Sequence, residues 1–174
     1  LLETMEIGSM CGFGQAVPAI QGGAAPNEPG QILVMLNVGA IFMGTALGTV
    51  KKTSLDEFSN PRKAGIIAVD LDPGDFLIGA ALTDGKHDVM LFSDGGKAVR
   101  FDEEDVRAMG RNARGVRGMM LEPGQSVIAM LVAEDESQSV LTATERGYGK
   151  RTSIAEYTRH GRGTKGMIAI QQTE

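Results

Sequence analysis

The stretch VMLFSDGGKAVRFDEEDV, residues 89–106, carries the signal of a β-hairpin followed by a helical turn. An apolar run leads into a turn that ends at Gly96, and a second strand, KAVRF, follows it. Two short runs of β-forming residues on either side of a glycine-containing turn are typical of an antiparallel hairpin. Asp102 and Asp105 then stand at the spacing of a helix N-cap and the acidic residue that accompanies it. The stretch therefore predicts a hairpin closed by a single helical turn.

This pattern occurs three times along the chain. IFMGTALGTVKKTSLDEF (41–58) precedes the quoted stretch by 48 residues, and VLTATERGYGKRTSIAEY (140–157) follows it by 51 residues. Each copy keeps the turn glycine, the basic second strand and the cap residue with an acid three positions later. After each copy, a polar and basic segment reaches a glycine that opens a new apolar run, at Gly65, Gly118 and Gly166. These runs predict buried strands.

A Pro-Gly pair marks a further repeated turn, at residues 29–30, 73–74 and 123–124. Blocks of about four short strands that recur every 40 to 50 residues, without long helical patterns between them, favour a propeller-like array of blades. We therefore expect an all-β fold with about three blades in residues 27–174. Residues 1–26 do not fit the repeat and are left unassigned.

Composition limits the class of protein. The chain is 42% hydrophobic and 22% charged, which is typical of a globular domain. No apolar run reaches the roughly 18 to 20 residues needed to cross a bilayer. A single cysteine, Cys11, excludes a disulfide framework and a four-cysteine metal site. We expect a cytoplasmic protein without a membrane partner, a cofactor or a bound metal.

The net charge of −5 conceals an uneven distribution, because residues 1–50 contain no lysine or arginine. The basic residues recur at equivalent places, in the second hairpin strands and in the linking segments 59–65, 111–118 and 158–166. Such clusters are often only solvated surface, but blades that stand side by side would bring these positions onto one rim. The residues of this positive band would be Lys51, Lys52, Arg62, Lys63, Lys97, Arg100, Arg111, Arg114, Arg117, Lys150, Arg151, Arg159, Arg162 and Lys165.

A curved band of positive charge suits duplex DNA, because evenly spaced lysines and arginines gain affinity from the phosphates by releasing counterions, without reading any base. Aromatic residues make up 5% of the chain, and few of them lie among the basic residues. This scarcity argues against the stacking of single-stranded bases.

The segments FMGTALGTVKKTSLDEF, DVMLFSDGGKAVRF, VRAMGRNARGVRGM and LTATERGYGKRTSIAEY resemble consecutive blades of the C-terminal domain of DNA gyrase A subunits, over residues 28–174. The resemblance implies about three blades of a six-bladed β-pinwheel. In that family the basic outer rim wraps DNA, so that the enzyme introduces negative supercoils. The resemblance also implies that the rest of the gyrase A subunit and the gyrase B subunit are partners. It implies further that catalysis lies in other domains, so that neither Tyr148 nor Tyr157 is the tyrosine that cleaves DNA. The glutamine- and arginine-rich box of the family's first blade is absent, and the A-type subunits of topoisomerase IV carry similar blades.

Two further expectations concern the ends of the repeat. Half a ring leaves exposed strand edges, which favours association of chains into a homo-oligomer. LLETMEIGSMCGFGQAVPAI, residues 1–20, resembles the end of the flavin-binding subunit of NADH or formate dehydrogenases, where such a cysteine is a ligand of an iron–sulfur cluster. Cys11 has no partner cysteines in this chain, so we expect no cluster, and residues 1–26 suggest a chimera.

Two other functions remain open: a propeller whose basic rim binds an acidic protein, and a shuffled or engineered fragment with a structural role only. No pattern predicts catalysis or a metal ion. DLDPGD (70–75) contains a Pro-Gly turn, DEED (102–105) fits a helix cap, and His87 and His160 lie far apart without a nucleophile beside them.

Overall fold

The protein is built from strands. The computed structural model describes residues 39–60 and 65–171, and in these ranges the elements are ten β-strands and three short 3₁₀ turns. The prediction of an all-β fold is therefore confirmed. Within the described ranges, no helix has the length and apolar character needed to span a membrane.

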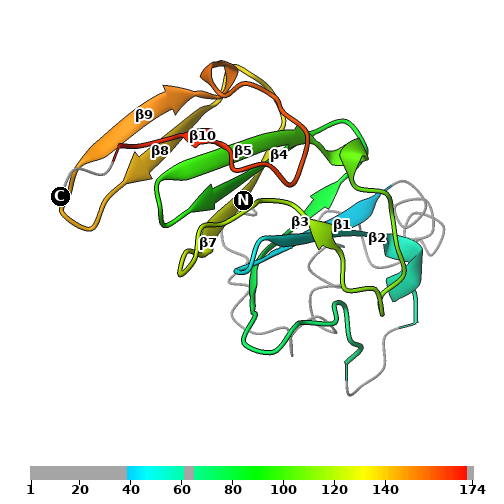
Figure 1. The fold of residues 1–174 in the computed structure, drawn as a ribbon. Coiled ribbons are helices and arrows are strands. Elements are labelled where there is room, and N and C mark those ends of the chain that lie inside the picture. Colours follow the sequence, from blue (N-terminus) through cyan, green and yellow to red (C-terminus); the bar gives the residue numbers. More distant parts are fainter. Residues whose placement is uncertain (1–38, 61–64, 172–174) are drawn as a thin grey trace.

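The strands form three sheets, which Figure 1 shows as successive layers. The first has the order β3-β1-β2-β6, and its strands are β1 (Ala40–Thr45), β2 (Thr49–Ser54), β3 (Leu77–Thr83) and β6 (Val116–Arg117). The second has the order β7-β4-β5-β10, and its strands are β4 (Asp88–Ser93), β5 (Lys97–Asp102), β7 (Val127–Ala133) and β10 (Met167–Ile168). The third is the hairpin of β8 (Ser139–Ala143) and β9 (Gly149–Ser153). All paired strands are antiparallel.

Each four-stranded sheet is completed by a strand from the next repeat unit. Strand β6 of the second unit pairs with β2 of the first, and β10 of the third unit pairs with β5 of the second. The main chain repeats these contacts beyond the strands, because the carbonyl of Gly48 accepts bonds from Gly118 and Met119, and that of Gly96 accepts bonds from Ala169 and Ile170. The units are therefore interlocked through their backbones.

This strand exchange corrects one part of the predicted repeat. The glycine equivalent to Gly166 is Gly115 rather than Gly118, since each precedes the exchanged strand and has a positive φ, 74° and 108°. A Cβ atom on Gly115 would lie 2.6 Å from the carbonyl oxygen of Val50. The buried strand predicted after Gly65 is also wrong, because residues 65–72 form no strand. The equivalent strands, β6 and β10, pair with the second hairpin strand of the unit before them, and the described residues contain no unit before the first.

The predicted hairpin turns, caps and Pro-Gly turns are present. Ser54, Asp102 and Ser153 each accept a bond from the backbone N–H two residues on. They begin the 3₁₀ turns η2 (Leu55–Phe58), η3 (Glu103–Asp105) and η4 (Ile154–Glu156). In the Pro-Gly turns, Asp75 and Gln125 donate to the carbonyls three residues earlier, with φ near +80° at the glycines. The copy at 29–30 lies outside the described residues.

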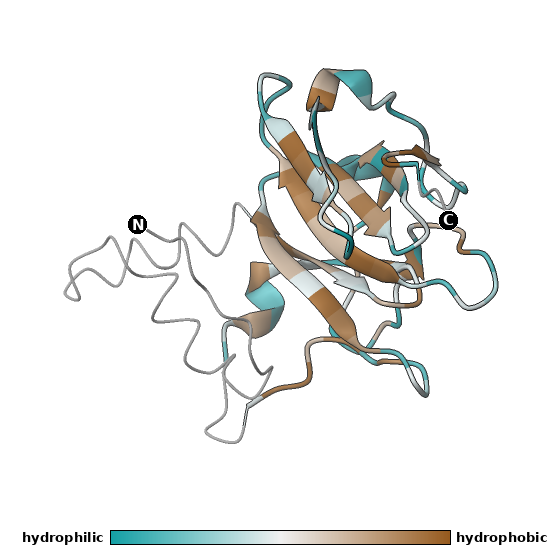
Figure 2. Cartoon of the chain, turned by 90° about the vertical axis from the view of Figure 1, so that its left-hand side faces the viewer, coloured by the Kyte–Doolittle hydropathy of each residue, from teal (hydrophilic) through white to brown (hydrophobic). Residues whose placement is uncertain are grey.

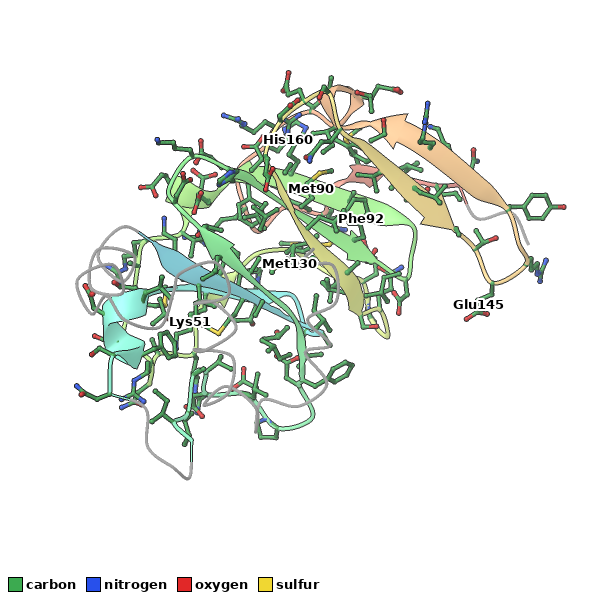
Figure 3. The ribbon with its side chains drawn as sticks, turned by 180° about the vertical axis from the view of Figure 1, so that it is seen from behind. Lys51, Met90, Phe92, Met130, Glu145 and His160 are labelled. Atoms are coloured by element: carbon green, nitrogen blue, oxygen red, sulfur yellow. The ribbon has the colours of Figure 1, made fainter. Side chains whose placement is uncertain are left out.

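The central strand β4 of the second sheet is buried on both faces, and its inner residues 89–92 are all apolar. Val89 and Leu91 of β4 belong to the core shared with the first sheet, whereas Met90 and Phe92 belong to the core shared with the third. Side chains alternate between the faces of a strand, and Figure 3 labels Met90 and Phe92 within the layers. Figure 2 shows the resulting hydrophobic bands along the strands, with hydrophilic turns around them.

Candidate nucleic-acid interface

Lys51 is a buried structural residue, in contrast to its predicted place on a DNA-binding rim. Its side chain is 1% exposed, and its ammonium group donates to the carbonyl of Ala68 at 2.9 Å and to that of Arg111. Burial, together with the nearby charge of Arg111, lowers the pKa of Lys51. Figure 3 labels Lys51 on the first sheet, to which its strand β2 belongs. It cannot reach a phosphate without leaving these partners.

Lys52 and Arg100 hold consecutive units together. They occupy equivalent positions, 48 residues apart, and both are buried. The ammonium group of Lys52 donates to the carbonyl of Glu103 at 3.2 Å and to the Glu104 carboxylate at 2.5 Å. Arg100 likewise donates to the carbonyl of Ile154 at 2.9 Å. Glu103 and Ile154 are the first residues of η3 and η4, so each cation caps the turn of the next unit.

Two carboxylates surround Arg100 in addition. Its guanidinium lies 2.6 Å from Asp88 and 2.7 Å from Glu136, and a second carbonyl, of Tyr157, accepts a bond at 3.0 Å. Burial alone would lower the pKa of Arg100, but the hydrogen bonds to Glu136 and Asp88 outweigh this effect and the pKa is raised. Lys51, Lys52 and Arg100 are therefore not available to a phosphate, because their side chains are buried and bonded inside the fold.

The linking segments of the second and third units lie side by side, as the repeat predicts, and the second also contacts residues 65–72, which follow the first linking segment. Arg162 donates to the carbonyl of Arg117 at 3.3 Å, and Met120 N–H donates to that of Thr164 at 2.9 Å. Arg111 bonds to the carbonyl of Ile67 at 3.2 Å. The segments 65–72, 107–118 and 158–166 are thus joined in one surface. Arg62 and Lys63 lie outside the described residues.

Several exposed cations of this surface already face acidic residues. Arg114 lies 3.0 Å from Asp72 and 3.4 Å from Asp70, and Arg159 lies 2.8 Å from Asp88. Lys165 and Lys97 both pair with Glu122, at 2.9 and 3.6 Å; the hydrogen bond and charge of Lys165 lower the pKa of that carboxyl. Exposed pairs of this kind are weak, but the neighbouring carboxylates reduce the positive potential that a phosphate would meet.

Other exposed cations have no acidic partner within 39–60 and 65–171. Arg117 and Lys150 form no ion pair, and Arg162 bonds only to the carbonyls of Asp105 and Arg117. Arg107 and Arg146 are equally exposed and unpaired, although they were not among the predicted contacts. Both lie within the basic clusters of the sequence, and that clustering is the signal that could have identified them.

Arg151 stands apart from these residues. It occupies the position of Lys52 and Arg100 in the third unit, but it is exposed and forms no ion pair with any described residue. It has the repeat position of a contact between units, but it makes no such contact among the described residues.

The repeat units coincide with matches to a known family. The model of the DNA gyrase C-terminal domain, beta-propeller, matches residues 40–84, 87–134 and 138–174. The chain belongs to this family. The three matched ranges follow the three repeat units, which confirms the resemblance found in the sequence.

Relatives and solved structures agree with this membership. The DNA gyrase A protein of Pseudomonas aeruginosa is 51% identical over 161 residues, and the match covers 92% of this chain but 17% of that protein. The C-terminal domain of DNA topoisomerase IV has a TM-score of 0.72 and 30% identity, covering 75% of this chain and 41% of its own. A DNA gyrase A C-terminal domain has a TM-score of 0.66 and 29% identity, covering 75% and 43%.

The relative from Pseudomonas also bears on residues 1–26. A match that covers 92% of the chain leaves about 14 residues outside it, so it extends into this segment. The interpretation of residues 1–26 as a foreign segment therefore finds no support. Their conformation, and the surroundings of Cys11, lie outside the described residues.

Proposed function

We propose that this gyrase-family chain binds duplex DNA without sequence preference and, as part of a gyrase A protein, wraps it in support of negative supercoiling. The observation that carries the proposal is the surface formed by the adjacent linking segments, from which Arg107 and Arg117 project without acidic partners among the described residues. Arg146 and Lys150 add unpaired charge at the β8–β9 hairpin. Membership of the gyrase family supports DNA as the polyanion.

The physics of phosphate binding explains why these side chains suffice. An unpaired exposed cation exchanges water and counterions for a phosphate, whereas a paired one must also give up a carboxylate. Bending a site of 20 to 30 base pairs costs on the order of 1–6 kcal/mol, which several such contacts offset. Glycines such as Gly110 and Gly161 leave the backbone open to close approach, since nothing lies within 4 Å of a Cβ atom built on them.

In this proposal the chain is an accessory module rather than a catalyst. Strand cleavage and ATP hydrolysis belong to the remainder of the gyrase A and B subunits, and the module acts on chromosomal DNA in the cytoplasm.

A salt series with matched variants tests the proposal. The affinity of the chain for short and long DNA duplexes is measured for two variants, Arg117→Ala and Arg114→Ala. Arg114 is the matched control, because it pairs with Asp70 and Asp72. We expect Arg117→Ala to reduce the slope of log K against log salt by about 0.9, the value of one phosphate contact, and Arg114→Ala to reduce it less. Binding that is independent of duplex length and insensitive to both variants would instead favour an acidic protein partner.

We also infer that the outer face of the third unit associates with another unit. Leu141 of β8 is 73% exposed, whereas its equivalents Phe42 and Met90 are fully buried. Arg151 on the same hairpin lacks the carbonyl that Lys52 and Arg100 bind. In a longer chain a further blade would cover this face, and in this chain alone a second copy would do so. The mass in solution tests the second case: Leu141→Asp should dissociate a dimer, and a monomer at high concentration would contradict it.

A further inference from the structure

A buried acid in the second unit breaks the repeat. Leu55, Glu103 and Ile154 begin the three 3₁₀ turns, and the backbone N–H of each donates to the carbonyl sixteen residues earlier, at Gly39, His87 and Gln138. Leu55 and Ile154 pack in apolar clusters. Glu103 is instead a carboxylate with 0% exposure. Because burial of a carboxylate is costly unless it is compensated, and because the fold accepts an aliphatic residue here, the acid requires another explanation.

Two polar side chains converge on Glu103 from the β3–β4 loop. The Nδ1 atom of His87 lies 3.6 Å from Oε1 of Glu103 and 3.0 Å from Oδ1 of Asp84. The three potential ligand atoms all lie within 4.8 Å of one another. The backbone N–H groups of Gly85 and His87 also donate to Oε1 of Glu103, at 2.9 and 2.8 Å. These bonds fix the orientation of the carboxylate toward the histidine.

A second observation concerns what these groups lack. Oε2 of Glu103 is buried and has no hydrogen-bond partner, and Nδ1 of His87 is likewise buried without a hydrogen bond, among the described residues. Fully buried polar atoms in native proteins are nearly always satisfied by a protein group, a water molecule or an ion. A ligand of positive charge at this point would satisfy both side chains at once.

We propose that Asp84, His87 and Glu103 bind a divalent transition metal ion, with zinc as the best fit. One imidazole nitrogen and two carboxylate oxygens are typical zinc ligands, with bonds of about 2.0–2.2 Å. Tetrahedral coordination at such lengths separates ligand atoms by about 3.3–3.6 Å. The Nδ1 atom of His87 lies 3.0 Å from Oδ1 of Asp84 and 3.6 Å from Oε1 of Glu103, near this value, and all three groups offer ligand atoms within 4.8 Å of one another. Calcium and magnesium prefer sets of six or more oxygen atoms. The Asp84 side chain is 46% exposed, so the ion can enter from solvent and keep a water ligand.

The site lies at the junction of two units. Glu103 begins η3, and its carbonyl accepts the bond from Lys52 of the first unit, whose charge is paired with Glu104. A metal ion would join the β3–β4 loop to η3 and so hold in place the turn that Lys52 caps. The expected role is structural, independent of the DNA-binding surface.

Zinc binding to the full chain tests the proposal directly. A Cys11→Ser background removes the lone thiol as a competing ligand, and zinc sulfate is titrated by calorimetry, with thermal unfolding measured in zinc and in EDTA. We expect one zinc ion per chain and a higher Tm in zinc. His87→Gln should abolish both effects, because it removes the imidazole ligand. The fold should accept glutamine here, since glutamine stands at the equivalent position 138 in the third unit. His160→Gln is the matched control, since it changes the other histidine of the chain and should leave zinc binding unchanged.

A further variant separates metal binding from folding. Glu103→Leu places in the second unit the residue that the first unit has at this position, and it should keep or raise the Tm in EDTA while removing the response to zinc. The absence of zinc binding in the Cys11→Ser protein, or a zinc response that survives either His87→Gln or Glu103→Leu, would overturn the assignment. Replacing zinc with cobalt gives an independent readout, because a tetrahedral nitrogen and oxygen site gives intense visible absorption.

Discussion

Replacing Arg100 with alanine should destabilise the protein far more than the equivalent change at Arg151. The guanidinium of Arg100 is 5% exposed and binds two carboxylates and two carbonyls. Removing one partner of a buried ion pair typically costs about 3–5 kcal/mol, because the other charge is left uncompensated. Arg159 remains 2.8 Å from Asp88 and provides partial compensation. We therefore expect a loss near the lower limit, about 3 kcal/mol.

Urea and thermal denaturation at a fixed protein concentration measure this effect. For a domain of this size, about 3 kcal/mol corresponds to a fall in Tm of roughly 6–12 °C. Arg151→Ala, at the same repeat position but exposed and unpaired, should change the free energy of unfolding by less than about 0.5 kcal/mol. Equal losses for the two variants would refute the conclusion that the burial of this position by the next unit determines its role. The Arg100→Ala protein, measured well below its Tm, should keep the salt dependence of DNA binding.

Three further changes test other parts of the structure. Gly166→Ala should destabilise the protein by more than about 2 kcal/mol, because its Cβ atom would collide with the carbonyl of Ala98 and alanine would have to adopt a positive φ. Gly124→Ala also requires a positive φ but has open space around it, so it should cost only about 1 kcal/mol in a parallel urea titration. Asp102→Ala removes the acceptor of the Glu104 N–H and should cost about 1 kcal/mol, measured by thermal unfolding; no loss would mean that the cap contributes nothing. Burial lowers the pKa of Lys51 from 10.5 in the folded protein. Between this lowered pKa and 10.5, the unfolded chain binds more protons than the folded chain. The free energy of unfolding of the wild type should therefore rise relative to that of Lys51→Met as the pH approaches 10.5. A constant difference across that range would contradict the lowered pKa.

The local elements were predictable from short patterns. The turn at Gly96 and the caps at Ser54 and Asp102 depend on interactions between residues two to four positions apart, so the residue types alone identify them. The repeat then indicated three hairpins of equal kind, and an all-β fold followed. The exchange of β6 and β10 was not predictable in this way, because it pairs strands more than 60 residues apart.

The candidate site shows the same division more sharply. Lys52, Arg100 and Arg151 share one pattern and one repeat position, and the sequence therefore assigned them one role. The structure separates them, because the first two face the 3₁₀ turn of a following unit and the third does not. A charge pattern records which groups are present, but not which of them lose contact with water.

What the sequence by itself determined is the set of building blocks: the hairpins, their caps and turns, the number of units and the family. What only the tertiary structure decided is which cations remain available for a phosphate, which glycine precedes each exchanged strand, and that Asp84, His87 and Glu103 meet. The physical reason is the range of the interactions. Turns and caps are set by neighbours along the chain, whereas burial and charge neutralisation depend on groups that only the packing of one unit on the next brings together.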